Sequence, residues 1–210
     1  MGAICSLLKR LAGLSSGSAK QGMASDVEMG STHPMAKLDM TCRGPKVQVG
    51  RSGAGAGEQV RGSGTVLCNT SIQQDRAYFE VTVETPGEFR VGCGQRPKLA
   101  AEDYEGGALD KHLGEGSDAT WGLPVADLNA GDCIAVTYDQ LSSATPELNF
   151  YINGTMLEGA IIAKKTRGPV FPAISLAPPT VLRVNFGNGD NFEHELPNGF
   201  MHVVPSSDLI

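Results

Sequence analysis

The chain has no run of about eighteen apolar residues, so the sequence offers no candidate for a transmembrane helix. Its start lacks the uninterrupted apolar core of a secretory signal peptide, because Lys9 and Arg10 interrupt it. Basic residues are also scarce, since 17 lysines and arginines stand against 23 acidic residues. A nucleic-acid-binding face needs a basic excess. We therefore expect neither a membrane span nor a nucleic-acid partner.

The cysteines show no pattern that would make a disulfide framework or a zinc site. There are five, an odd number without C-x-x-C spacing: Cys5, Cys42, Cys68, Cys93 and Cys133. The four histidines, His33, His112, His194 and His202, are isolated from one another and from the cysteines. This distribution predicts a reducing compartment, no metal and no cofactor. Cys93 and Cys133 fall inside apolar strands, where we expect inert thiols.

Glycine and proline are abundant, with 27 and 12 residues in a chain of 210, which favours many tight turns over long helices. Five short runs rich in β-branched and aromatic residues are bounded by Gly, Pro, Asn or Asp, as strands are. They are Tyr78–Val83, Phe89–Gly94, Gly131–Asp139, Leu148–Gly154 and Val170–Gly187. Residues 34–210 are therefore predicted to form one all-β domain, with ten core side chains: Phe79, Val81, Val91, Ile134, Val136, Phe150, Ile152, Phe171, Ile174 and Val184.

The turns give the expected strand pairing. Thr85-Pro86-Gly87-Glu88 predicts a type II turn, after which Phe89–Gly92 returns as the antiparallel partner of Tyr78–Val83. Asn153-Gly154 is the strongest short hairpin signal. Val170–Leu176 and Val181–Phe186, separated by Pro178-Pro179, are expected to close the sheet.

Two further stretches lie before Tyr78. Leu38 and Met40, then Val47 and Val49, alternate with polar residues as half-buried strands do. The glycine-dense stretch Gly50–Gly64 could suggest a phosphate-binding loop, but it has no Gly-Lys-Ser/Thr motif opening a helix. A mobile hairpin loop is the better interpretation.

The first residues carry an acylation pattern. Gly2 becomes N-terminal after removal of Met1, and Ser6 completes the N-myristoylation motif. Cys5 stands where a palmitoyl chain is commonly added, and residues 1–20 contain Lys9, Arg10 and Lys20 but no acid. Because one acyl chain binds a bilayer only marginally, such a second signal is needed for stable attachment. Residues 1–33 thus predict a flexible, acylated leader on the cytoplasmic face of a membrane. The alternative is a soluble cytosolic chain without an anchor.

Six motifs appear in the same order as in the SPRY domain family, which this chain resembles. They are Y-F-E-V from Tyr78, R-V-G from Arg90, G-D-x-I from Gly131, F-Y-x-N-G from Phe150, F-P-A-x-S-L from Phe171 and V-x-x-N-F-G at Leu182–Gly187, where Leu182 stands in place of the Val. The resemblance implies a concanavalin-like β-sandwich of two antiparallel sheets. It further implies a non-enzymatic role, in which loops at one edge of the sandwich are presented to a peptide segment of a partner.

A sugar-processing enzyme is the alternative from another class, since lectin-like sandwiches also host glycosidases. Such enzymes place two carboxylates on either side of the scissile bond. Glu80 and Glu84 could share a face, but Pro86 and Gly87 are expected to end the strand there. We expect both acids to be solvated charges at a sheet edge.

The segment Gln95–Pro124 lies between two predicted strands and has no clear periodicity. Loops on rigid scaffolds often carry binding residues, with Tyr, Trp and Arg as anchors. The candidate partner-binding residues are Arg96, Lys98, Tyr104, Lys111 and His112. Trp121 is assigned to the core, and Tyr104 to the surface.

Overall fold

The computed structural model describes residues 35–51, 53, 57–96, 120–125, 127–142, 144–158, 161–162, 169–188 and 191–205, with the backbone alone for 120–125 and 161–162. Every regular element in these ranges is a strand, which confirms the all-β prediction. Within the same ranges, no helix is long and apolar enough to cross a membrane. The predicted leader, residues 1–33, lies outside the described residues.

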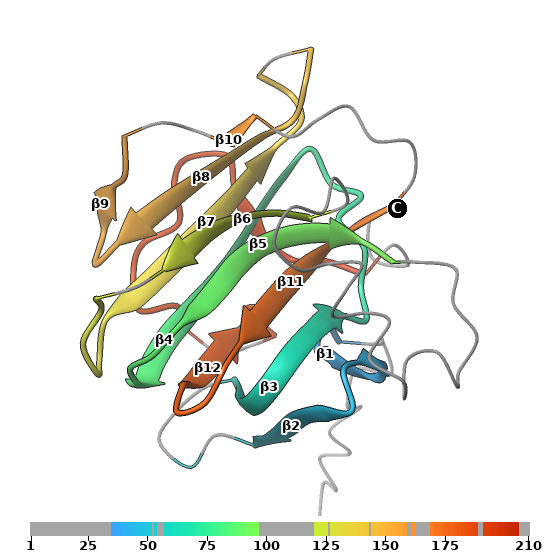
Figure 1. Ribbon diagram of the computed structural model, residues 1–210. Coiled ribbons are helices and arrows are strands. Elements are labelled where there is room, and N and C mark those ends of the chain that lie inside the picture. The colour runs from blue at the N-terminus through green and yellow to red at the C-terminus, as the bar shows by residue number, and fades with distance from the viewer. Residues whose placement is uncertain are drawn as a thin grey trace, which may run out of the picture. The chain divides into compact units, whose positions relative to one another are not determined.

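The strands form two sheets (Figure 1). Sheet I has the order β1-β3-β11-β5-β6, with β1 at Leu38–Arg43, β3 at Glu58–Cys68, β11 at Val170–Leu176, β5 at Phe89–Gln95 and β6 at Thr120–Val125. All its pairings are antiparallel.

Sheet II has the order β10-β8-β7-β4-β12-β3-β2. Its strands are β10 at Ile161–Ile162, β8 at Glu147–Ile152, β7 at Cys133–Asp139, β4 at Arg76–Thr85, β12 at Val181–Asn185 and β2 at Lys46–Arg51. Two short strands join it: β9 (Thr155–Met156) pairs with β8, and β13 (Met201–His202) pairs with β4 in parallel.

Strand β3 belongs to both sheets. Its first half, 58–61, pairs with β12 in sheet II, and its second half, 64–67, pairs with β11 in sheet I. Gly62 lies at the change of sheet with φ of 106°, and a Cβ there would come within 2.1 Å of the Lys46 carbonyl oxygen. Glycine is required at this point because only glycine adopts that φ without a side-chain collision.

The predicted hairpin between Tyr78–Val83 and Phe89–Gly92 is wrong. Strand β4 pairs with β7 and β12 in sheet II, whereas β5 pairs with β11 and β6 in sheet I. The connection 86–88 therefore crosses from one sheet to the other. Likewise β11 and β12 lie in different sheets and do not pair with each other, contrary to expectation.

The two crossing connections lie against each other. The Glu88 carbonyl oxygen accepts hydrogen bonds from the Ala177 N–H (3.1 Å) and the Thr180 hydroxyl (3.1 Å). The type II prediction is also wrong, because Gly87 is not in the left-handed region. Position 87 instead requires glycine because the two connections approach closely there: a Cβ at Gly87 would lie 2.3 Å from Thr180 Oγ1.

Side chains from both sheets fill one apolar core. Eight of the ten predicted core residues are buried, and the exceptions are Ile152 and Phe171, which are half-buried. Ile152 ends its strand beside the Asn153-Gly154 turn. Phe171 alternates with the buried Val170 and Ile174, so the two-residue period of β11 directs it to the outer face of sheet I.

The remaining turn predictions have mixed outcomes. Asn153 and Gly154 have φ of 50° and 78°, as a tight hairpin between β8 and β9 requires. Gly50–Gly64 is largely strand, because β2 and β3 pair from Lys46–Ser63 to Arg51–Glu58. Met40 is 53% exposed, since the pairing of β1 shifts register between Leu38 and Arg43.

Candidate binding pocket at one end of the sandwich

Several connections meet at one end of the two sheets. Arg76 is the first residue of β4, and in the strand register it lies opposite Asp139, the last residue of β7. Asp139 lies opposite Glu147, the first residue of β8. The end of β5 pairs with the start of β11 at Gln95 and Val170, and Ile72 bridges to Val170. The connections 69–75 and 140–146 and the residue that follows β5 therefore lie at the same end.

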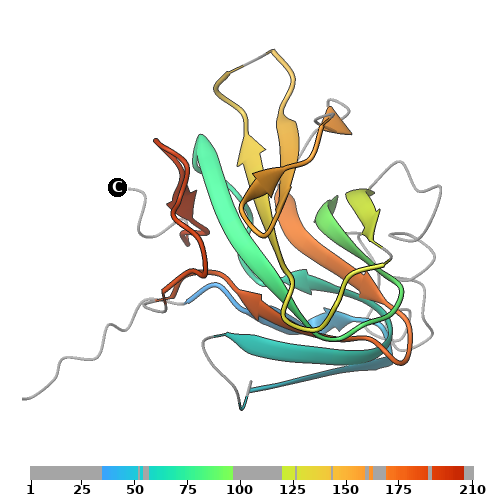
Figure 2. The same cartoon turned by 90° about the vertical axis from the view of Figure 1, so that its left-hand side faces the viewer.

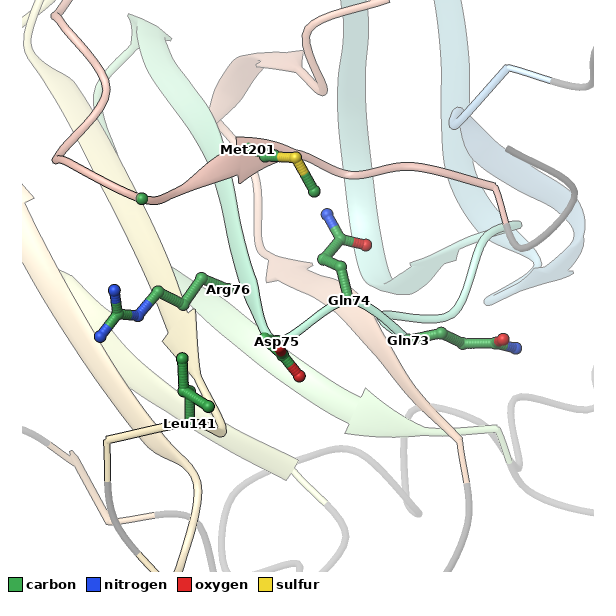
Figure 3. A pocket seen from close by; sticks show the side chains of 7 residues that line it. Gln73, Gln74, Asp75, Arg76, Leu141 and Met201 are labelled. Atoms are coloured by element: carbon green, nitrogen blue, oxygen red, sulfur yellow. The ribbon is translucent and has the colours of Figure 1, made fainter. Parts of the chain in front are cut away.

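A pocket of about 390 Å³ lies at this end (Figure 3). Three separate parts of the chain line it: residues 73–76, the start of the β7–β8 connection at Leu141, and the C-terminal segment at Gly199 and Met201. The pocket is therefore a product of the tertiary fold.

Arg76 forms the rigid part of the lining. Its Nε donates to Asp139 Oδ2 at 3.0 Å, its Nη2 donates to the Ser142 hydroxyl at 2.9 Å, and its guanidinium lies 5.5 Å from the ring centroid of Phe200. Gly199 makes room for the guanidinium, since a Cβ there would lie 2.9 Å from Arg76 Nη1. The arginine is thus held in place before any ligand arrives.

Asp139 organises the loop that carries Leu141. Its Oδ1 accepts the backbone N–H groups of Leu141 (2.8 Å) and Ser142 (3.0 Å), and its Oδ2 accepts the Ser142 hydroxyl (2.7 Å). Burial raises the pKa of Asp139, but these hydrogen bonds and the charge of Arg76 outweigh burial, so its pKa lies below the usual value. The carboxylate is ionised at neutral pH.

Gln74 ties the C-terminal segment to the rest of the domain. The residue is buried, and its side-chain amide donates to the His202 carbonyl at 2.5 Å and accepts from the Val204 N–H at 3.4 Å. Gln140 continues the network by donating to the Gln74 carbonyl at 2.7 Å. In Figure 3 the Gln74 side chain points toward the segment of Met201, whereas Gln73 points away from it.

The rim of the pocket is exposed and chemically mixed. Leu141 is 61% exposed and Met201 is 47% exposed, so two large apolar side chains meet solvent at the same pocket. Gln73 and Asp75 are exposed beside them and supply an amide and a carboxylate. This combination can bury an apolar side chain of a ligand while it binds a basic group or a peptide backbone.

Glu80 is not the solvated edge charge that the sequence predicted. It is 1% exposed and accepts three hydrogen bonds, from the Tyr78 hydroxyl (2.6 Å) and the N–H groups of Glu193 (2.7 Å) and His194 (3.0 Å). Burial and the bond to Glu80 raise the pKa of Tyr78. The carboxylate thus holds the C-terminal segment on the outer face of sheet II.

Glu84 does share a strand with Glu80, because β4 continues to Thr85. Its carboxylate accepts from the Gln59 amide at 2.6 Å and lies 3.8 Å from Arg183. Because both acids are bonded to structural partners, the pair does not have the arrangement of a glycosidase, which needs sugar between the two carboxylates. Among the described residues, no group of three or more His, Cys, Asp or Glu could hold a metal ion.

The thiols Cys93 and Cys133 are buried, as predicted, and neither is in a disulfide. Burial raises the pKa of Cys133 to about 12 and raises that of Cys93 further. Both thiols are therefore protonated at neutral pH and are poor nucleophiles.

Of the predicted partner-binding residues, the structure describes Arg96 alone. It follows β5, forms an ion pair with Asp39, and places its guanidinium 5.5 Å from the ring centroid of Phe171. Lys98, Tyr104, Lys111 and His112 lie outside the described residues, as do Gly2 and Cys5. The Trp121 backbone pairs with Cys93, and the assignment of its side chain to the core stays a prediction.

Sequence reasoning missed the pocket residues. A weak signal was present at Leu141, an apolar residue in the polar run Asp139-Gln140-Leu141-Ser142. No sequence signal marked the other lining residues Gln74, Gly199 and Met201. The pairing of β13 with β4 brings them together, and that pairing joins distant parts of the chain.

Comparison with known proteins identifies similar chains. The family model described as SPRY domain matches residues 76–189, more than half of the chain. SPRY domain-containing protein 7 from Gallus gallus and from Homo sapiens are each 26% identical over 179 residues, which cover 81% of this chain and 84% of the relative. The solution structure of the NEUZ (NHR) domain in Neuralized from Drosophila melanogaster has a TM-score of 0.49 and 13% identity, covering 74% of this chain and 93% of that domain.

Proposed function

The chain belongs to the SPRY domain family, whose members are protein-interaction modules, and on this premise we propose that it binds a peptide segment of a protein partner in the pocket lined by residues 73–76, Leu141 and Met201. The observation that carries the proposal is the exposed pair Leu141 and Met201 on a pocket whose other wall is held rigid by the Arg76–Asp139 ion pair. Exposed apolar side chains that rim a preformed pocket are typical of interaction sites.

The chemistry of the pocket defines the partner segment. An apolar side chain of the partner fits between Leu141 and Met201, and a lysine or arginine beside it meets the exposed carboxylate of Asp75. The Gln73 amide can bond the partner's backbone. Binding needs no catalytic group, and the roles of Glu80 and Glu84 in holding the fold support a function without turnover.

The segment that follows β5 begins at the same end of the sandwich as this pocket. Arg96, Lys98, Tyr104, Lys111 and His112 therefore remain candidates for a second part of the same interface. Their participation would extend the contact from a pocket to a broader surface.

The proposal includes attachment to the cytoplasmic face of a membrane through myristate on Gly2 and palmitate on Cys5. The support is the sequence of residues 1–20, in which acylation sites and basic residues coincide. The same domain acting as a soluble cytosolic adaptor is the alternative.

The test compares Leu141→Asp/Met201→Asp with a matched control, Met40→Asp/Met156→Asp, whose side chains are 53% and 50% exposed on β1 and β9. Proteins retained by the intact wild-type chain from a cell extract are quantified by mass spectrometry, and each candidate is then produced and titrated against all three proteins. We expect a partner that binds wild type and control but loses about tenfold or more in affinity for the double variant. A partner that binds all three equally would contradict the pocket assignment.

A further inference from the structure

The charge of the chain is divided unevenly along the sequence. Residues 1–68 contain eight basic and four acidic residues, a net charge of +4, whereas residues 69–210 contain nine basic and nineteen acidic residues, a net charge of −10. Such asymmetry in an acidic chain points to a local partner of negative charge.

The fold gathers the described basic residues of the first part on one edge. Strands β1 and β2 are the neighbours of β3 in sheets I and II and lie at the same side of the sandwich. In Figure 2 the hairpin of β2 and β3 lies along the lower margin, and the connection between β7 and β8 lies at the top. We name the strands β1 to β3 the basic edge.

Three cations of the basic edge are exposed to solvent: Lys46, Arg51 and Arg61. Lys46 and Arg61 lie on the outer face of the hairpin, because their sequence neighbours Val47 and Val60 point inward and are buried. Arg51 ends β2 on the other face of the strand, across from Glu58. Arg61 Nε donates to the Gln48 side chain at 3.0 Å. Among the described residues, no carboxylate lies within ion-pair distance of these three.

The acids of the same edge are neutralised or buried. Asp39 forms an ion pair with Arg96, and Glu58 is half-buried and accepts the Leu38 N–H at 2.6 Å. Burial is the main cause that raises the pKa of Glu58 above its usual value. The basic edge therefore presents positive charge to solvent, whereas Asp127, Glu158 and Glu195 are exposed on other elements.

We propose that the basic edge, with Lys46, Arg51 and Arg61, is a membrane-contact surface that takes a bilayer containing anionic phospholipid. The inference rests on the acyl anchor of the proposed function, and it adds an orientation. Positive charge faces the bilayer and the acidic remainder is repelled from it. The sheet order places β7 and β8 on the other side of β4 from β3, so the pocket between residues 73–76 and Leu141 stays open to the cytoplasm.

The test uses the full chain, made with an N-myristoyltransferase, and vesicles of phosphatidylcholine with and without phosphatidylserine. The variant is Lys46→Gln/Arg51→Gln/Arg61→Gln. The control, Ala144→Glu/Thr155→Glu/Asn198→Asp, makes the same change in net charge at exposed positions away from the basic edge. Each basic residue near an anionic surface contributes about fivefold in partition, so three contribute up to about a hundredfold.

We expect the variant to lose about tenfold or more in sedimentation with phosphatidylserine vesicles, at unchanged melting temperature, and to match wild type on phosphatidylcholine alone. The control should stay close to wild type. Equal loss in variant and control would indicate an effect of net charge alone. No loss in either would leave the cations only the role of guarding the edge strand β2 against pairing. Either result would overturn the proposal.

Failure of the anchor gives a different result. An intact mass without myristate contradicts the acylation, and the same pair of variants is then compared as unmodified protein at low salt, where screening is weakest. A difference between variant and control under those conditions supports the basic edge without the anchor, and its absence overturns the basic edge.

Discussion

Replacement of Glu80 by Gln should detach the C-terminal segment from sheet II. The carboxylate accepts from three donors, with Oε1 facing Tyr78 and His194 and Oε2 facing Glu193. An amide has the same shape but one acceptor atom, so either orientation leaves a backbone N–H facing the NH2 group. A buried donor without an acceptor costs about 1–3 kcal/mol, and hydrogen bonds to a charged acceptor are the stronger kind.

We therefore expect Glu80→Gln to lower the free energy of unfolding by about 2–3 kcal/mol. For a domain of this size, the melting temperature should fall by about 5–10 °C. Glu84→Gln is the matched control, because it makes the same chemical change four residues along β4 at a partly exposed carboxylate. Glu84→Gln should lower the free energy of unfolding by less than about 1 kcal/mol.

The assay is urea denaturation of both variants, with hydrogen exchange at the amides of Glu193 and His194. These two amides should exchange faster in Glu80→Gln, and less so in the control. If Glu80→Gln keeps the wild-type midpoint and the two amides remain protected, the carboxylate does not hold the segment, and the reasoning is refuted.

Three other predictions test the core, an ion pair and the leader. Phe150→Ala should lower the free energy of unfolding, measured by urea denaturation, by about 3–5 kcal/mol. Phe171→Ala should lower it by less than about 2 kcal/mol, because Phe171 is half-buried. Equal losses would contradict the assignment of Phe171 to an outer face. Because the pKa of Asp139 is lowered in the folded protein, its contribution to stability is present above about pH 4 and is lost as the pH falls further. Asp139→Asn should therefore reduce the slope of the free energy of unfolding against pH below about pH 4, and an unchanged slope would contradict the role of the carboxylate. Gly2→Ala should release the protein from membranes in cell fractionation and Cys5→Ser should weaken retention, and equal membrane fractions for all three proteins would contradict the anchor.

Much of the fold could be predicted because the signals were local. Alternation in Tyr78–Val83 placed Phe79 and Val81 in the core, and Asn153-Gly154 fixed a hairpin, since both depend on a few adjacent residues. The six ordered motifs also led to the family that the comparison shows. Acylation at Gly2 and Cys5 stays a prediction.

The pairing of strands was decided only by the tertiary structure. A Pro-Gly turn between two strands looks the same whether the second strand returns in the same sheet or crosses to the other. Here Gly87 allows the connection to lie against Thr180, and the hydrogen bonds of Glu88 fasten the two crossings together. That contact joins residues more than ninety positions apart, and no local pattern encodes it.

The candidate binding sites divide in the same way. The sequence by itself determined the charge asymmetry, the acylation pattern and the family motifs, because each is a property of residue type and order. The tertiary structure decided that Glu80 is buried and bonds the C-terminal segment, and that Arg76, Leu141 and Met201 line the same pocket. The physical reason is that the fate of a polar or apolar side chain depends on which distant segment covers it, and here the C-terminal segment covers Glu80 and leaves Leu141 exposed.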